Sequence, residues 1–165
     1  MMKRIALLLL SSLIIVSCGT SKSVSYTHKP LAAEGCSVSY SAVSQDGQPV
    51  IVVSVKSDRL VFGDNPIMQL KNFKGEVLKL EGTNLQSRTE TSGVLISNVV
   101  VPISELNALA QFPINAEDIS FFESGIAKVR LSTIPIVHEK TFSRDQIGSY
   151  LYKALLKEQA AADDF

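Results

Sequence analysis

The sequence predicts an α+β protein in which an antiparallel sheet of about six or seven strands carries a C-terminal helix on one face. Two observations lead to this prediction. Several segments alternate apolar and polar residues with a period of two, and the last helical segment combines a capping motif with an apolar stripe. Two short helices are expected between the last strands. The alternative is a closed or two-sheet β structure capped at one end by the helix.

The clearest strand signal lies in residues 36–42, where Cys36, Val38 and Tyr40 alternate with serines. The dipeptide Asp46-Gly47 is typical of a two-residue hairpin turn, and it leads into the apolar run 50–53. Because that run is apolar on both faces, its strand is expected to be central in the sheet or covered.

The remaining strands are expected from shorter alternating segments. The polar stretch 84–92 has no apolar periodicity, so it is expected to be an exposed loop. The expected strands are 59–62, 68–71 and 78–81 with a turn near Lys74-Gly75, 94–101, 127–133, and one more after Pro135.

The two short helices are expected in succession after the 94–101 strand. Ser104 can cap a helix over 105–111, which would end before Pro113. Asn115 can cap a second helix that runs to residue 122, and Gly125 stands where helices commonly end.

The most regular helix is expected at the C-terminus. Ser143 and Gln146 form a capping box, and Phe142 and Ile147 occupy the positions of a hydrophobic staple. The apolar stripe should cover strand faces such as those of Val129 and Leu131, and residues 161–165 are expected to be a solvated tail. The stripe consists of Ile147, Tyr150, Leu151, Ala154 and Leu155.

The N-terminus combines the basic residues Lys3 and Arg4 with an apolar run over 5–16, which is too short for a membrane-spanning helix. The run ends in the sequence Ile15-Val16-Ser17-Cys18. This tetrapeptide resembles the lipobox of bacterial lipoproteins, in which the cysteine becomes the lipidated first residue of the mature chain. The alternative is an ordinary cleaved signal peptide with a chance cysteine.

The lipobox resemblance implies a membrane anchor at Cys18 made of a diacylglyceryl group and an N-acyl chain such as palmitate. Several acyl chains together hold a protein stably at a bilayer. In the lipoproteins that the segment resembles, an Asp after the cysteine favours retention in the inner membrane, so Gly19 implies the outer membrane. Because no acidic residue precedes Glu34, the periplasmic face is expected.

The chain divides into a signal peptide at 1–17, a lipidated N-terminus and flexible tether at 18–34, one globular domain at 35–160 and the tail. Removing the signal peptide takes away two of the 16 basic residues and none of the 16 acidic ones, which leaves a net charge of −2. Since the basic residues are also scattered singly, nucleic acid is not an expected partner.

Few residues could carry chemistry. His138 is the lone histidine outside the signal peptide and tether, it is expected on a strand facing away from Glu139, and no metal-ligand spacing surrounds it. Cys36 is expected to be a buried strand residue without an internal disulfide partner; the alternatives are a reactive or intermolecular thiol, or a pair with His138. No metal, cofactor or catalytic residue is predicted.

Two pairs of neighbouring residues lie in the second short helix. Glu117 and Asp118 suit the positive end of the helix dipole, and adjacent positions on a helix do not suit paired catalytic carboxylates. Phe121 and Phe122 are expected to be one buried and one partly covered ring; the alternative is an exposed platform for a sugar or protein. Together with His138, these rings are the candidate binding residues.

The sequence therefore predicts a lipid-anchored, non-enzymatic envelope protein that binds another envelope protein or supports assembly. The alternative is a periplasmic domain that binds a small molecule or lipid on a concave sheet face. An unpaired edge strand or exposed apolar patch favours the first function, and a curved sheet with an apolar inner face favours the second. The oligomeric state is left open.

Overall fold

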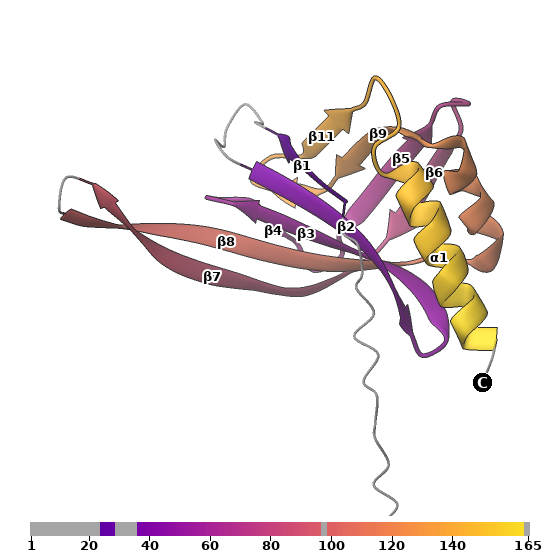
Figure 1. Cartoon of the computed structure of the whole chain (residues 1–165), viewed down its shortest axis with the longest axis horizontal. Helices are drawn as coiled ribbons and strands as arrows, with labels where there is room; N and C mark the ends of the chain where they lie inside the picture. The colour runs from indigo at the N-terminus through magenta and orange to yellow at the C-terminus, as the bar shows by residue number, and fades with distance from the viewer. Residues whose placement is uncertain (1–23, 29–35, 97–98, 164–165) are drawn as a thin grey trace, which may run out of the picture.

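The computed structural model describes residues 24–28, 36–96 and 99–163, of which 24–28, 86, 90–105 and 162–163 are described by their backbone alone. Strands in these ranges form three antiparallel sheets, accompanied by a 3-10 helix and an α-helix (Figure 1). The elements are β1 (Val24–His28), β2 (Cys36–Gln45), β3 (Gln48–Ser57), β4 (Val61–Phe62), β5 (Ile67–Asn72), β6 (Val77–Glu81), β7 (Thr83–Ile96), β8 (Val99–Pro113), η1 (Ala116–Ser124), β9 (Ile126–Leu131), β10 (Thr133–Ile134), β11 (His138–Thr141) and α1 (Gly148–Asp163).

The largest sheet has five strands in the order β1-β2-β3-β8-β7. Its β2–β3 turn places Asp46 and Gly47 at φ angles of 52° and 78°, the positive values that a two-residue hairpin requires. Cys36, Val38 and Tyr40 of β2 are buried, and the serines that alternate with them, Ser37 and Ser39, are half-buried. The alternation in the sequence therefore directs one face of this sheet into the core.

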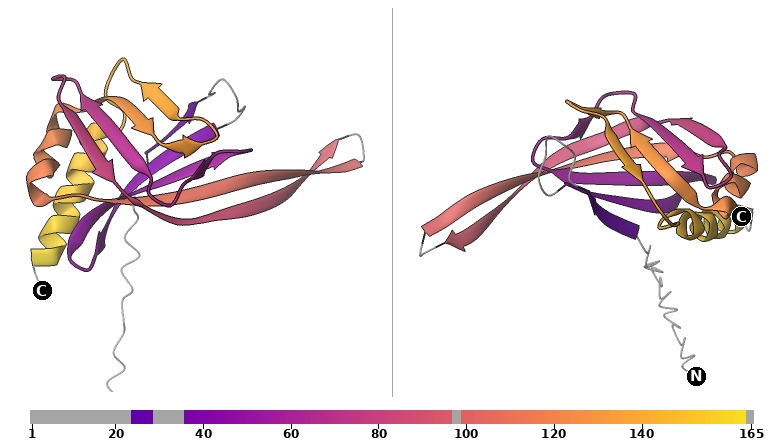
Figure 2. Two further views of the ribbon diagram at one scale, coloured as in Figure 1. Left: turned by 180° about the vertical axis from the view of Figure 1, so that it is seen from behind. Right: turned by 90° about the horizontal axis from the view of Figure 1, so that it is seen from above.

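A second sheet has four strands in the order β11-β9-β5-β6, and its inner face shares one apolar core with the first sheet (Figure 2). The register aligns Met68 of β5 with Leu131 of β9, and Leu131 with His138 of β11; all three are buried. Their sequence neighbours Arg130 and Glu139 are exposed on the outer face. The third sheet is the short β4–β10 pair.

Strands β7 and β8 continue beyond the rest of the domain as a two-stranded arm (Figures 1 and 2). β3 pairs with β8 only from Leu106 to Pro113, whereas β7 follows β8 as far as the pair Ile96 and Val99. We call residues 90–96 and 99–105 the arm. At roughly 3.3 Å per residue, the arm is about 23 Å long.

Helix α1 closes the end of the domain opposite the arm, where it contacts β2, β3 and η1 (Figure 1). Ile147, Leu151 and Leu155 are fully buried, so the predicted apolar stripe is part of the core. The helix covers the five-stranded sheet and η1 more than the strand of Val129 and Leu131, because the inner face of that strand is directed at the opposite sheet.

Two sequence predictions fail in the segment that forms β7 and β8. Residues 84–92 belong to β7 and are not a loop, and residues 105–111 belong to β8 and are not a helix capped by Ser104. Ala108 and Ala110 of β8 are buried opposite Val55 and Val53 of β3, so the period of two prevails over helix propensity. The single strand expected at 94–101 is divided between β7 and β8.

The boundaries of the C-terminal helix also differ from the prediction. The helix begins at Gly148 because the carboxylate of Asp145, and not Ser143, accepts hydrogen bonds from its first backbone N–H groups, at 2.8 Å from Gly148 and 2.7 Å from the next residue. At its other end the helix continues to Asp163, into the segment expected to be a tail.

The α+β class, the antiparallel pairing and the C-terminal helix are confirmed. The described strands form three sheets where one was expected, a layering closer to the two-sheet alternative, and the described helices are two. The second short helix is present as η1, followed by Gly125 at a φ of 70°. Part of the expected tether, Val24–His28, pairs with β2 as an edge strand.

Candidate functional site

The predicted lipidation residue Cys18 lies outside the described residues, so anchoring stays a prediction. None of the helices in the described ranges is long and apolar enough to cross a membrane.

Cys36 lies on β2 with its side chain fully buried, as predicted. Burial, with a smaller contribution from the negative charge of Asp58, raises the pKa of the Cys36 thiol to about 11. A reactive cysteine requires a thiolate near neutral pH, and this environment disfavours one. Cys36 and His138 belong to different sheets, and the structure does not pair them as strand neighbours.

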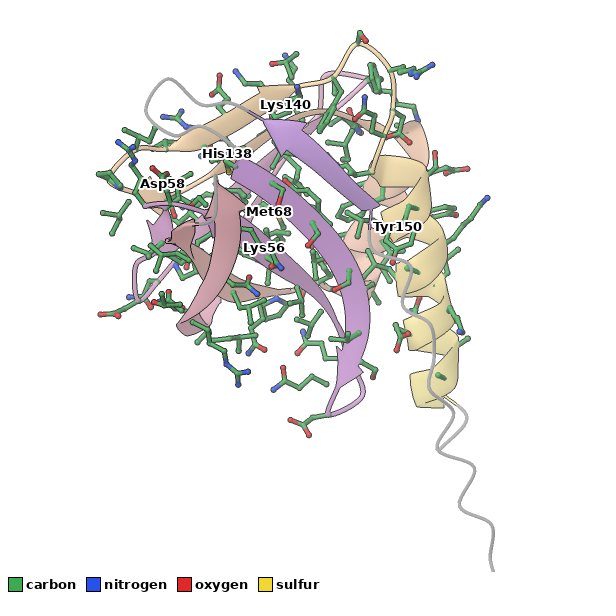
Figure 3. All side chains as sticks on the ribbon, turned by 60° about the vertical axis from the view of Figure 1, so that its left-hand side comes forward. Lys56, Asp58, Met68, His138, Lys140 and Tyr150 are labelled. Atoms are coloured by element: carbon green, nitrogen blue, oxygen red, sulfur yellow. The ribbon has the colours of Figure 1, made fainter. Side chains whose placement is uncertain are left out.

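His138 lies on β11 with its side chain buried, and Glu139 is exposed, so the two face opposite ways as the sequence predicted (Figure 3). The backbone N–H of His138 donates to Thr133 Oγ1 at 2.9 Å. In the part of the chain that the structure describes, no group of three His, Cys, Asp or Glu side chains could hold a metal ion. The position of His138 is that of a core residue.

The phenylalanine pair in η1 matches the prediction of one buried and one partly covered ring. Phe122 is fully buried, Phe121 packs against the core, and their ring centroids lie 5.6 Å apart in an edge-to-face arrangement. Glu117 and Asp118 lie in the first turn of η1 as expected, and Asp118 accepts a hydrogen bond from Asn115 Nδ2 at 3.2 Å. The rings therefore form no exposed platform.

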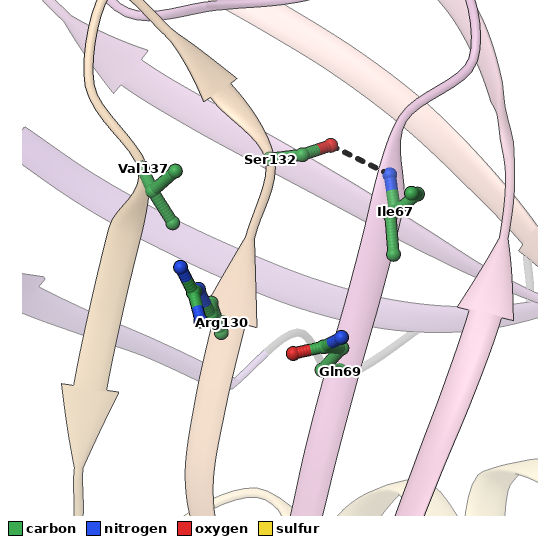
Figure 4. A pocket seen from close by; sticks show the side chains of 5 residues that line it. All are labelled: Ile67, Gln69, Arg130, Ser132 and Val137. Atoms are coloured by element: carbon green, nitrogen blue, oxygen red, sulfur yellow. Dashed lines mark hydrogen bonds between the residues drawn. The ribbon is translucent and has the colours of Figure 1, made fainter.

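A shallow hollow of about 250 Å³ lies on the outer face of the four-stranded sheet (Figure 4). Its polar groups are the Arg130 guanidinium, the Gln69 amide and the Ser132 hydroxyl, whose oxygen accepts a hydrogen bond from the Ile67 N–H at 2.6 Å. Val137, which is 45% exposed, forms one apolar wall. The sequence analysis did not identify this hollow, because its residues come from two segments about 60 residues apart in the chain, 67–69 and 130–137.

The charges around this hollow are paired with each other. Lys128 Nζ lies 2.8 Å from Glu139 Oε1, and Arg130 Nε lies 4.0 Å from Glu139 Oε2. The hydrogen bond from Lys128, followed by the charges of Lys128 and Arg130, holds the pKa of the Glu139 carboxyl below its ordinary value. Glu139 is shared by two cations, so these three groups keep one positive charge in excess, and the face can offer hydrogen bonds to a polar group.

The arm offers a different kind of surface. Among the described strands, β7 forms a ladder with β8 alone, which makes it an edge of the five-stranded sheet; at its base the Asn84 side chain donates a hydrogen bond to the Phe62 carbonyl of β4. Beside the base of β7 lies a second hollow, of about 410 Å³, lined by Asn65, Ile67, Glu81, Gly82, Thr83 and Pro113. The sequence does contain a signal for the arm, since Ser97-Asn98 separates two apolar runs of strand-forming residues at 94–96 and 99–101.

Comparisons of the chain with protein-family models, with curated proteins and with solved structures find no match.

Proposed function

We propose that this protein is a lipid-anchored, non-enzymatic component of the cell envelope that docks to a protein partner through the arm. The observation that carries the proposal is that β7 and β8 project about 23 Å beyond the last residue of β3 that pairs with β8. A two-stranded ribbon is only marginally stable in water by itself, so an arm of this length is best explained by a partner that covers it.

The composition of the arm supports its burial against another protein surface. The stretch from Thr91 to Ser104 contains no charged residue, and it ends in apolar residues on both strands. The register places Leu95 opposite Val100 and Val94 opposite Val101, and successive pairs alternate between the two faces. Both faces of the arm are therefore apolar at its end, as expected for a segment inserted between other surfaces.

A binding site for a small molecule on the inner sheet face receives less support. Tyr40, Leu70 and Phe112 point into the space between the sheets and are at most 1% exposed, so core side chains fill that space. The hollows near Arg130 and Gly82 lie outside the core and are open. An edge strand with an open side favours contact with another protein, and β7 is such a strand among the described residues.

The proposed anchor places the domain near the membrane surface. Only residues 19–23 separate Cys18 from the start of β1, and six peptide steps span at most about 20 Å. β1 pairs with β2 from Val24 opposite Tyr40 to His28 opposite Cys36, and the Cys36 end of β2 is the end nearest the arm. Val24 therefore lies beside the middle of β2, farther from the arm than His28 does.

The test is to replace residues 91–104 with Asn-Gly, which closes the hairpin between Glu90 and Glu105. The full chain should then fold with nearly unchanged thermal stability, because the removed residues pair only with each other. The sizes of native complexes extracted from the envelope are the measurement. Loss of a wild-type complex supports the proposal, and unchanged complexes contradict it. Val77→Ser, which removes a side chain 65% exposed on β6, is the control and should leave complexes intact.

A further inference from the structure

The outer edge of β7 differs from that of β8 in its capacity to pair with another strand. β7 contains no proline, whereas β8 carries Pro102, opposite Gly93. Because proline has no N–H to donate, it is tolerated in a ladder where its nitrogen faces away from the neighbouring strand. Pro102 therefore interrupts the outer edge of β8, and the edge of β7 is left as the one suited to strand addition.

Pro102 also fixes which residues of β7 present their backbone outward. In an antiparallel ladder the N–H and C=O groups of successive residues point alternately toward the partner strand and away from it. If the backbone groups of Pro102 and Gly93 point away from each other, then the backbone N–H and C=O groups of Thr91, Thr89 and Ser87 also point to the outer edge of β7. The register between β7 and β8 is uninterrupted over this stretch, since its irregularity lies between Asn84 and Gln86.

The charges on β7 are few and self-complementary. Arg88 and Glu90 are the only charged residues between Glu81 and Glu105. Within the arm, the register places Glu90 directly opposite Glu105, an arrangement of like charges that disfavours the hairpin. A positive charge on the open side of Glu90 would compensate this repulsion.

We propose that the partner of the arm is a second copy of this chain, paired antiparallel along β7 about a two-fold axis at Thr89. This register places Arg88 opposite Glu90 of the second copy, and Glu90 opposite Arg88. It also joins Ser87, Thr89 and Thr91, whose backbone groups face outward. Two-fold axes at the neighbouring residues 87, 88, 90 and 91 fail to pair opposite charges, and those at 88 and 90 set like charges against each other. The inference rests on the proposed function of the arm as a protein-docking element.

The same register brings the apolar end of each arm to the base of β7 in the other copy. Pairing about Thr89 carries Leu95 toward Thr83 of the other copy and Ile96 toward Gly82. Thr83 and Gly82 line the hollow of about 410 Å³ at the base of β7. Each arm then adds two strands to the other copy's five-stranded sheet. A lipid bilayer is a poorer destination, because the open edge of β7 would leave backbone groups unpaired in hydrocarbon.

Disulfide trapping in membranes tests the position of the two-fold axis on the full chain. In Thr89→Cys, the two introduced cysteines face each other at about 5.5 Å between Cα atoms, within disulfide reach, so mild oxidation should give a covalent dimer. Ser87→Cys is the matched control. Its side chain is also exposed, but the two copies of residue 87 are offset by four residues, about 13 Å, and should not cross-link. The wild-type chain gives the background.

Co-expression of Ser87→Cys with Thr91→Cys should restore cross-linking, because residue 87 faces residue 91 of the other copy. Equal yields from Thr89→Cys and Ser87→Cys indicate random collision and overturn the proposal. Absence of a Thr89 cross-link also overturns it.

Charge reversal provides an independent measurement. Arg88→Glu or Glu90→Arg each sets like charges across the two-fold axis, and dimerisation of the detergent-extracted chain should weaken about tenfold. The double variant Arg88→Glu/Glu90→Arg should recover the wild-type dimer, and a mixture of the two single variants should form heterodimers. A double variant that folds but stays monomeric contradicts the register.

The two proposals fail differently. If Thr89→Cys gives no homodimer but replacement of residues 91–104 releases a different protein from the extracted complex, the arm is a docking element and its partner is not a second copy. If the replacement changes no complex, the docking function itself fails.

Discussion

At the scale of single residues, Asp145 connects the end of η1, the start of β9 and helix α1. Its Oδ1 accepts hydrogen bonds from the N–H groups of Ile126 and Gly148, at 2.9 and 2.8 Å, and its Oδ2 accepts from the backbone and hydroxyl of Ser149. Gly148 allows the approach, because a Cβ there would lie 2.6 Å from Gly125 Cα. One carboxylate thus positions the helix against the rest of the core.

Asp145→Ala should lower the free energy of unfolding by about 1–3 kcal/mol, since it removes a helix cap and leaves the Ile126 N–H without its acceptor. Chemical denaturation of the full chain is the measurement. Glu123→Ala, at an exposed position of η1, is the control and should change stability by less than about 0.5 kcal/mol. Equal effects of the two substitutions would show that the hydrogen bonds of Asp145 do not contribute to the free energy of unfolding.

The Asp145 carboxyl should also make stability depend on acid pH. Burial raises its pKa, but the hydrogen bonds from Ser149, Ile126 and Gly148 outweigh burial and lower the pKa from 3.8. A carboxyl with a lowered folded-state pKa stabilises above its unfolded pKa, and that contribution is lost as the pH falls through the folded value. Wild type should therefore lose more stability below about pH 3.8 than Asp145→Asn does.

Cys36 should be inert in the folded protein, because a buried thiol with a pKa of about 11 is almost entirely protonated at pH 8. Iodoacetamide should label it only after denaturation, as mass spectrometry of peptides would show. Since no described cysteine offers it a disulfide partner, reductant should not change the melting temperature. Rapid labelling of the native protein would mean that the β2 region opens readily.

At the scale of elements, α1 is part of the core. Leu151→Ala should cost about 2–5 kcal/mol, the usual range for a fully buried leucine. Lys153→Ala, two residues away on the exposed side, should stay within about 0.5 kcal/mol. Urea denaturation compares the two. If Leu151→Ala kept the wild-type midpoint but altered the extracted complexes, the stripe would be a docking surface.

Secondary-structure elements were predictable where one face is buried and the other is exposed to solvent. The β2–β3 hairpin, the β5–β6 hairpin and β9 show period-two alternation in sequence, and their burial follows it. The opposite faces of His138 and Glu139 on β11 followed from the same alternation. β7 lacked this signal, because Ser87, Arg88 and Thr89 are all exposed and no covered face imposes alternation.

Other features could not be read from one sequence because they depend on distant partners. Leu106, Ala108 and Ala110 suit a helix as well as a strand, and their pairing with β3, some 50 residues earlier, decides between the two. The division into separate sheets depends on β9 pairing with β5, across about 60 residues. The hollows at Arg130 and Gly82 arise from such long-range contacts, so sequence analysis missed them. The arm is a local hairpin, and the sequence analysis missed it because it predicted one strand over 94–101 in spite of the Ser97-Asn98 interruption.

At the scale of the whole molecule, the proposed lipid anchor at Cys18 should control where the protein resides. Mass spectrometry of the mature N-terminus should find an acylated Cys18, and Cys18→Ala should no longer partition with membranes. Cys36→Ala is the control, since it replaces a cysteine inside the domain and should leave membrane association unchanged. An unmodified mature chain in the soluble fraction would refute the anchor.

The short connection between Cys18 and β1 also has a consequence for orientation. Two copies related by a two-fold axis can both insert their acyl chains in one leaflet only if that axis runs along the membrane normal. A two-fold axis that relates neighbouring antiparallel strands is perpendicular to the sheet they form. The connection between Cys18 and β1 spans at most about 20 Å, so the sheet has little freedom to tilt relative to the membrane. The proposed lipid-anchored dimer should therefore lie with its continuous sheet parallel to the lipid surface.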